Sequence, residues 1–209
     1  MTSGPVVFVV DDDPAVRSSL KFLISTVGLR IESFESADTF LAKEPALDEP
    51  SCLVLDVRLP GLSGLEFQRE LAARNIHIPV VFVTGHGDIP MSVRAMKAGA
   101  VEFLTKPFRD EDLLDAIRIA LARDRVWRAK DKELTELQQR FQSLTPREQQ
   151  VISMVVSGML NKQIAAQLGT AENTVKVHRS RAMEKMSAQS LADLVTMIQK
   201  LKSPSEKAL

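Results

Sequence analysis

The chain has 209 residues, 44% of them hydrophobic and 26% charged, which is typical of a globular protein with room for two domains. Its single cysteine, Cys52, excludes an internal disulfide framework. No charged leader or long apolar run occurs, so we expect no signal peptide, no membrane contact and a cytoplasmic protein. Residues 1–122 hold 12 Lys/Arg and 18 Asp/Glu, a net charge of −6, whereas residues 144–209 hold 9 and 5, a net charge of +4. The basic end is therefore the candidate for binding nucleic acid.

The N-terminal part alternates apolar runs with amphipathic segments. Strands are predicted at 6–10, 29–34, the run ending at Asp56, 78–83 and 101–104, and helices at 14–27, 36–41, 64–74 and 89–98. This alternation with short connections predicts an α/β domain with a parallel five-stranded sheet and helices on both faces. The flavodoxin-like strand order 2-1-3-4-5 is the one we expect.

The carboxyl ends of four predicted strands carry polar residues, and that edge of an open α/β sheet is where ligands bind. Asp12, Asp56, Thr84 and Lys106 are expected around one crevice there. Taken alone, Asp56 can be a metal ligand, a nucleophile or a helix cap, and Asp11-Asp12-Asp13 can be a solvated turn. Together they suit a carboxylate that attacks phosphorus, with Mg²⁺ and the lysine neutralising the phosphoryl oxygens.

Beyond this domain the chain is predicted to be helical. No Gly or Pro lies between Pro107 and Pro146, so one long helix is expected from near Asp110 to about Phe141, although the sequence leaves its continuity open. Domain limits are predicted at 5–122, a helical linker at 123–143, and a second, all-α domain of four helices at 144–209.

The second domain has the outline of a helix-turn-helix. Thr145, Pro146 and Glu148 form the pattern of a capping box, and Gly169 marks a tight turn before a basic helix. Basic and polar residues on that helix can contact phosphates and base edges. The candidate DNA-binding residues are Asn173, Thr174, Lys176, Val177, Arg179, Ser180 and Arg181.

Four motifs in the first domain resemble the receiver domain of two-component response regulators. They are Val9–Asp13, Leu55–Gly64, Val83–Asp88 and Lys106-Pro107-Phe108. The resemblance implies that a histidine kinase phosphorylates Asp56 and that Thr84 and Lys106 contact the phosphoryl group. It implies Mg²⁺ (or Mn²⁺ or Ca²⁺) bound by Asp12, Asp56 and the backbone carbonyl of Arg58, with Asp11 in the outer shell and Asp13 as a further candidate there. It also implies a switch role for Phe103, which lacks a hydroxyl, and a cis Lys106–Pro107 bond.

The second domain resembles the LuxR-type helix-turn-helix of the FixJ/NarL response regulators. The motifs are Leu144–Glu148, Asn161–Ala165 and Thr174–Arg179. One departure is Ala171, where the family usually has a serine cap; Thr170 or a DNA phosphate could replace that cap. The resemblance implies a transcription regulator that is phosphorylated, forms a homodimer, binds double-stranded promoter DNA and works with RNA polymerase.

Two other functions are possible on the residues alone. A phosphatase or phosphotransferase with an aspartyl nucleophile needs a general acid two residues after Asp56, where this chain has Arg58. A phosphorylated adaptor whose helical domain binds protein is the other, and the salt dependence of DNA binding separates it from a DNA-binding protein. We therefore expect a regulator and not an enzyme.

Overall fold

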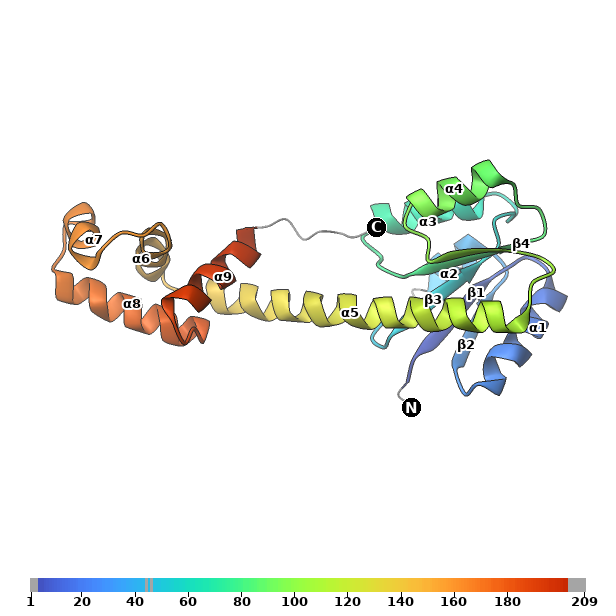
Figure 1. The fold of residues 1–209 in the computed structure, drawn as a ribbon, viewed down its shortest axis with the longest axis horizontal. Helices are drawn as coiled ribbons and strands as arrows, with labels where there is room; N and C mark the ends of the chain where they lie inside the picture. The colour runs from blue at the N-terminus through green and yellow to red at the C-terminus, as the bar shows by residue number, and fades with distance from the viewer. Residues whose placement is uncertain (1–3, 44, 46, 203–209) are drawn as a thin grey trace. The chain divides into compact units, whose positions relative to one another are not determined.

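The computed structural model describes residues 4–43, 45 and 47–202 (Figure 1). Residues 203–209 of the predicted second domain lie outside this description. Backbone contacts divide the chain into two compact units, Met1–Arg128 and Ala129–Lys207, which we describe separately. The division falls inside the predicted linker 123–143.

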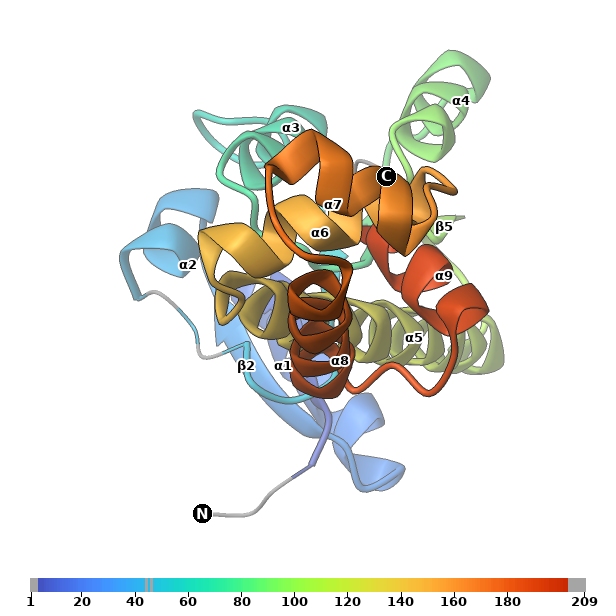
Figure 2. The same cartoon turned by 90° about the vertical axis from the view of Figure 1, so that its left-hand side faces the viewer.

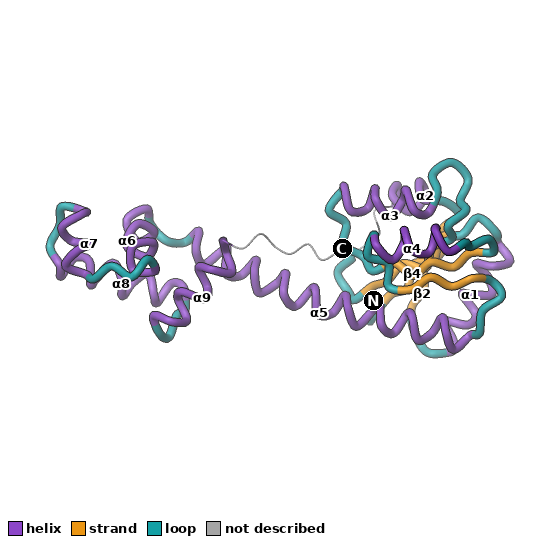
Figure 3. Tube along the Cα trace, turned by 45° about the horizontal axis from the view of Figure 1, so that its top comes forward, coloured by secondary structure: helices purple, strands orange, loops and turns teal. Residues whose placement is uncertain are grey.

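The first unit is built on a parallel sheet, whose strands are orange in Figure 3. Its five strands have the order β2-β1-β3-β4-β5, which confirms the prediction. The β-branched and apolar composition of β1, β3 and β4 suits central strands covered on both faces, and every residue of these three strands is buried. The strands are β1 Val6–Val10, β2 Arg30–Phe34, β3 Ser51–Leu55, β4 Val80–Thr84 and β5 Glu102–Thr105.

Five helices cover the two faces of this sheet: α1 Pro14–Thr26, α2 Ala37–Lys43, α3 Gly64–Ala73, α4 Ile89–Lys97 and α5 Asp110–Gln142. Alternate strand residues point to opposite faces, so Phe8 and Val9 belong to different cores. Apolar residues of α1 and of the first part of α5 pack on one face, and those of α2, α3 and α4 pack on the other (Figures 1 and 2).

The loops after β1, β3 and β4 are fixed by the caps of the helices that follow. Asp13 caps α1, Ser63 and Glu66 form a capping box on α3, and Asp88 caps α4. Each cap satisfies a backbone N–H that the helix itself leaves free. Three helices thus begin at defined positions beside the carboxyl edge of the sheet.

Helix α5 continues without a break to Gln142, one residue beyond the predicted end. The second unit also contains α6 Pro146–Val156, α7 Asn161–Leu168, α8 Glu172–Met186 and α9 Leu191–Lys202, packed around a separate apolar core. The predicted capping box at Thr145 and Glu148 is present, and Gly169 adopts the left-handed conformation (φ 61°) that ends α7. Among the described helices, none is long and apolar enough to cross a membrane.

Candidate metal centre and nucleic-acid interface

Three carboxylates meet at the carboxyl edge of the sheet. Asp11, Asp12 and Asp56 each offer a ligand oxygen, and these oxygens all lie within 4.8 Å of one another. They line a pocket of about 330 Å³ together with Asp13, Val16, Arg58, Thr84, Gly85, His86 and Lys106. The strand order therefore brings together all four residues that the sequence predicted around one crevice: Asp12, Asp56, Thr84 and Lys106.

Lys106 is the cation that faces these acids. Its Nζ donates to Asp11 Oδ2 at 2.8 Å and lies 3.5 Å from Asp56 Oδ2. Burial of Asp11 raises its pKa above the ordinary value, and the bonds from Lys106 and the Asp13 N–H offset this only in part. For Lys106, burial opposes the charged form, but the two carboxylates outweigh it and raise the pKa. One ammonium thus faces three acids.

The backbone holds Asp56 at the mouth of the pocket. Its N–H donates to Val10 O at 2.9 Å, and its Oδ1 accepts from the Arg58 N–H at 3.0 Å. The side chain is 11% exposed, so one face remains open. Gly64 allows α3 to approach, because a Cβ on it would lie 2.2 Å from Asp56 O. The Arg58 N–H bond ties the position of the carboxylate to the loop that also carries the Arg58 carbonyl.

Two residues at the acidic loop have roles that the sequence did not reveal. Arg17 donates from its guanidinium to the backbone oxygens of Asp11 at 2.7 Å and Asp12 at 2.9 Å. Asp13, which sequence reasoning left open as a member of the acidic cluster, uses its carboxylate to cap α1 by accepting from the Ala15 N–H at 2.8 Å. An arginine one helical turn after a capping aspartate was the available signal, since its side chain can reach back to the loop.

Thr84 and Phe103 lie on neighbouring strands beside this pocket. Thr84 is buried, and its Oγ1 accepts from the His86 N–H at 3.3 Å. Phe103 is partly buried against Phe82, with ring centroids 6.0 Å apart. The β4–α4 loop passes close to the Phe103 ring, because a Cβ on Gly87 would lie 2.8 Å from its Cε1. A movement of this loop therefore meets the Phe103 ring directly.

The donor set of the pocket fits a hard divalent cation. Carboxylate and carbonyl oxygens with room for water are the ligands that Mg²⁺ prefers. Burial raises the pKa of Asp11, and acids outnumber ammonium groups in the pocket. A cation at this position would offset the cost of burying the charge and neutralise the excess acids. The Lys106–Pro107 bond is cis, as the resemblance implied.

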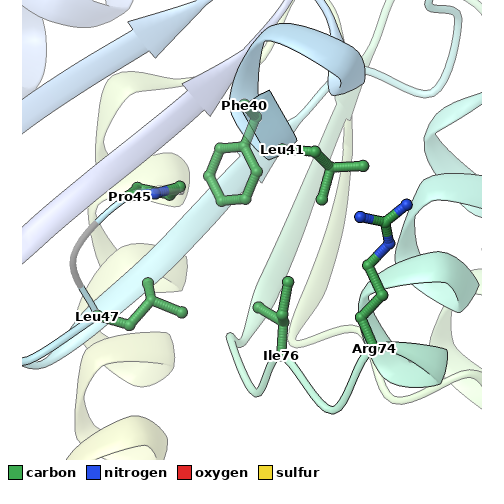
Figure 4. Close-up of a pocket in the computed structure, with 6 residues that line it drawn as sticks. All are labelled: Phe40, Leu41, Pro45, Leu47, Arg74 and Ile76. Atoms are coloured by element: carbon green, nitrogen blue, oxygen red, sulfur yellow. The ribbon is translucent and has the colours of Figure 1, made fainter. Parts of the chain in front are cut away.

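A second pocket, of about 370 Å³, opens near the amino ends of the strands (Figure 4). Its lining is mainly apolar, and its guanidinium, that of Arg74, is bound to Glu70 at 2.7 Å. Arg74 is thus already paired with a carboxylate of its own helix, and the acidic pocket, where three carboxylates face one ammonium, is the better candidate for chemistry.

In the second unit, α8 presents its polar residues outward, as predicted. Val175, Ala182 and Met186 are buried in the core of the unit, while Arg179 is partly buried and donates to Asn161 Oδ1 at 3.4 Å. Six of the candidate DNA-binding residues are exposed: Asn173, Thr174, Lys176, Val177, Ser180 and Arg181. The helix therefore offers a mixed basic and polar face of the kind that enters a major groove.

The start of α8 has no side-chain cap. Ala171 occupies the cap position and cannot accept a hydrogen bond from the first turn. The predicted substitute, Thr170, uses its backbone N–H to close the turn on Ala165 O at 3.0 Å. The first N–H groups of α8 are therefore without a cap from Ala171.

Both units match known protein families. Residues 7–118 match the response regulator receiver domain, and residues 142–198 match the bacterial regulatory proteins of the LuxR family. The two matches together cover most of the chain and coincide with the two sites described above.

Similar proteins align over nearly the whole length. Nodulation protein W of Bradyrhizobium diazoefficiens is 56% identical, covering 94% of this chain and 86% of its own. The transcriptional regulatory protein FixJ of Azorhizobium caulinodans is 46% identical, and the alignment covers 91% of this chain and 90% of that protein. Among solved structures, the response regulator StyR has a TM-score of 0.83 at 50% identity, covering 95% and 100%. Full-length FixJ from B. japonicum has a TM-score of 0.58 at 38% identity, covering 96% and 98%.

Proposed function

This chain belongs to the two-component response regulators that join a receiver domain to a LuxR-type DNA-binding domain, and we propose that Asp56 is its phosphoacceptor. The observation that carries the proposal is the position of Asp56. It lies at the mouth of an acidic pocket, with Lys106 Nζ 3.5 Å from its carboxylate. The donor is a phosphohistidine of a sensor histidine kinase.

The chemistry follows from the charges in the pocket. An Asp56 oxygen forms a bond to phosphorus as the phosphorus–nitrogen bond of the phosphohistidine breaks; the leaving imidazole nitrogen keeps the bonding electron pair and takes up a proton from solvent. Lys106 is placed to neutralise a phosphoryl oxygen, and the Thr84 hydroxyl to donate to another. Asp12, Asp56 and the Arg58 carbonyl would hold Mg²⁺, with Asp11 beside them, and the bound cation would supply further neutralisation of the phosphoryl oxygens. Arg17 keeps the Asp11 and Asp12 backbone in place.

Labelling with a small phosphodonor tests this proposal directly. The purified chain is incubated with acetyl phosphate and Mg²⁺, and phosphorylated protein is separated on a phosphate-affinity gel. We expect one acid-stable, hydroxylamine-sensitive phosphoryl group on wild type and none on Asp56→Asn. The matched control is Asp38→Asn, an exposed aspartate on α2 that should label like wild type. Equal labelling of Asp56→Asn would overturn the assignment.

We place the DNA contacts on α8, with Lys176 and Arg179 nearest to phosphates or guanine edges and Val177 near a thymine methyl group. Binding is to be measured on duplexes selected from a random pool by the phosphorylated chain. Lys176→Gln should weaken binding and reduce the salt slope by about one. The control is Lys202→Gln on α9, which makes the same charge change outside the recognition helix. A slope near zero for wild type would favour the adaptor.

Phosphorylation is expected to act on the α4 surface. Three side chains spaced along one side of this helix are exposed: Ile89 at 80%, Val93 at 44% and Met96 at 44%. Movement of the β4–α4 loop toward a phosphoryl group at Asp56 would shift this helix and relax the contact of Gly87 with Phe103. We propose that two phosphorylated copies pair through this surface, with RNA polymerase as a further partner at the promoter. Because this output is on chromosomal DNA, we assign the protein to the cytoplasm.

Pairing is tested by light scattering with and without acetyl phosphate. Wild type should shift from monomer to dimer, whereas Val93→Ser should remain monomeric while still accepting the phosphoryl group. A monomeric phosphorylated wild type would contradict the dimer. The aspartyl phosphatase receives no support from the site, because Arg58 provides no general acid and its N–H serves the Asp56 carboxylate.

A further inference from the structure

Asp124 is a carboxylate at a core position of α5. The preceding residues on the sheet-facing side of this helix are apolar and buried, among them Leu113, Ile117 and Leu121. Helical spacing turns Asp124 toward the same side, and its side chain is 0% exposed. A charge there is tolerated only if the surrounding groups bond to it.

The two oxygens of Asp124 face three different parts of the receiver unit. Oδ2 accepts from the Ser51 N–H at 2.8 Å and from Arg128 Nε, one turn further along α5. Oδ1 lies 3.6 Å from His77 Nδ1. Burial alone raises the pKa of Asp124, but His77, Arg128 and the Ser51 N–H outweigh it, so the pKa is lowered. The ionised form is therefore the one that this site holds.

Neighbouring residues of α5 extend the same attachment. Arg128 donates to Leu47 O, and its other terminal nitrogen lies 3.3 Å from Ser51 Oγ. The Trp127 ring stacks on His77, with centroids 3.8 Å apart and planes 4° from parallel. We call Asp124, Trp127 and Arg128, with their partners Leu47, Ser51 and His77, the α5 anchor.

The α5 anchor lies at the end of the sheet opposite the acidic pocket. Ser51 is the first residue of β3, and the last residue of β3 directly precedes Asp56. His77 lies shortly before β4, which ends at Thr84. The two strands that carry Asp56 and Thr84 at one end therefore hold α5 at the other.

Beyond the anchor, α5 is mostly exposed, and the ion pair of Glu133 with Lys200 of α9, at 2.6 Å, joins two exposed side chains. Between Arg128 and Leu137 no residue of this helix is buried, and Leu137 belongs to the core of the second unit. An isolated helical segment of this length is only marginally stable in water. Its helical state thus depends on how firmly the turn before it is held.

We propose that Asp124 is a positioning residue that fixes where α5 leaves the receiver, and that phosphorylation at Asp56 changes DNA binding only while this α5 anchor is intact. The inference rests on the proposed function. With the anchor in place, a receiver dimer holds two helical connections of defined direction. Without it, the connection becomes a flexible tether. The second DNA-binding domain of the dimer then binds its half-site at a lower effective concentration, and the affinity for DNA falls.

Hydrogen exchange on the full chain tests the structural part. In Asp124→Asn, amides 124–136 should exchange at least about tenfold faster and through an opening that depends little on urea, whereas the slowest amides of β1 and β4 should follow only the loss of global stability. Trp127, the only tryptophan of the chain, should shift its emission to longer wavelength. Arg128→Gln, which leaves the Ser51 N–H bond to Asp124, should give the same pattern more weakly. The control is Asp131→Asn, the same change at an exposed position on α5.

DNA binding tests the functional part, with duplexes selected from a random pool by the phosphorylated wild-type chain. Acetyl phosphate should label Asp124→Asn at the wild-type rate, yet the gain in affinity on phosphorylation should fall by about fivefold or more. An unchanged gain overturns the proposal, as does unchanged exchange at 124–136. If exchange at 124–136 in both anchor variants keeps the urea dependence of exchange in the sheet, these amides open only with the whole receiver unit and the proposal is wrong. If Asp56 is not the phosphoacceptor, this appears separately, because acetyl phosphate then leaves wild type unlabelled or labels Asp56→Asn equally.

Discussion

Asp11 and Asp124 are both buried aspartates, one at each edge of the same sheet, and their surroundings shift their pKa values in opposite directions. Asp11 is 2% exposed, and burial raises its pKa despite the bond from Lys106. Asp124 is 0% exposed, and its donors lower its pKa although burial opposes this. Burial is therefore not what distinguishes the two sites.

The difference lies in the balance of charges and donors around each carboxylate. Asp11 shares one ammonium with Asp12 and Asp56, so the carboxyl edge has unbalanced negative charge that a cation can neutralise. Asp124 Oδ2 accepts from a guanidinium and a backbone N–H of its own chain, while its Oδ1 lies 3.6 Å from His77 Nδ1 without a hydrogen bond. The carboxyl edge, where acids outnumber ammonium groups, is thus suited to chemistry, whereas Asp124, with a guanidinium and an N–H as donors, holds structure.

The largest expected effect tests the structural edge. Asp124→Ala should lower the free energy of unfolding of the receiver unit by about 3 kcal/mol, because it leaves a partly buried guanidinium and a buried N–H without their acceptor. Urea denaturation followed by circular dichroism measures this. Asp131→Ala, an exposed change on the same helix, should stay within about 0.5 kcal/mol of wild type. A loss below about 1 kcal/mol for Asp124→Ala would show that the anchor is weak.

A pH series separates the charge of Asp124 from its shape. An aspartate in an unfolded chain titrates near pH 3.9, and the folded pKa of Asp124 is lower. Its contribution to stability is therefore complete above about pH 4 and is lost as the pH falls through the folded pKa. The difference in unfolding free energy between wild type and Asp124→Asn should shrink as the pH falls below about pH 4. A difference that stays unchanged at low pH would contradict this origin.

The carboxyl edge was predictable from the sequence because parallel strands end together. Asp56, Thr84 and Lys106 each follow an apolar run, so the strand order alone places them in one pocket. The α5 anchor was not predictable in this way. Asp124 bonds to Ser51 across 73 positions, and Arg128 bonds to Leu47 across 81. In the sequence, Asp124 only marks where the helical apolar spacing becomes looser.

Local capping explains one further success and one failure. The predicted capping box at Thr145 and Glu148 involves residues three apart, a pattern that a sequence can reveal, and the structure adds a second such box at Ser63 and Glu66 that we did not predict. The aspartates of the acidic loop are a harder case, because three adjacent carboxylates look alike. Only the structure shows that Asp13 caps α1 while Asp11 and Asp12 join Asp56 in the cluster of possible metal ligands.

A smaller effect tests the edge with unsatisfied charge. Mg²⁺ at ten times its dissociation constant should add about 1.4 kcal/mol to the unfolding free energy, because it binds only the folded acidic pocket. Asp12→Asn should lose most of this gain, whereas Asp38→Asn, at an exposed position of α2, should keep it. Thermal unfolding at constant ionic strength, with KCl replacing MgCl₂, measures the difference. An equal gain in Asp12→Asn would exclude this pocket as the binding site.

The smallest expected effect extends the comparison to the start of α8, where the first backbone N–H groups have no acceptor from Ala171. In the receiver, α3 begins with Ser63, which satisfies such a group. Ala171→Ser should therefore stabilise the second unit by about 0.5–1 kcal/mol, as Ser63→Ala should destabilise the first by a similar amount. Far-UV circular dichroism during urea unfolding follows both changes.

The control for this substitution is Ala166→Ser, an exposed position inside α7 where serine has no capping role and slightly disfavours the helix. If Ala171→Ser stabilises no more than this control, its hydroxyl makes no capping bond. If it stabilises as expected and weakens binding to the selected duplex, a DNA phosphate occupies the same N–H groups in the complex. The cap is then absent because the helix start is reserved for the nucleic acid.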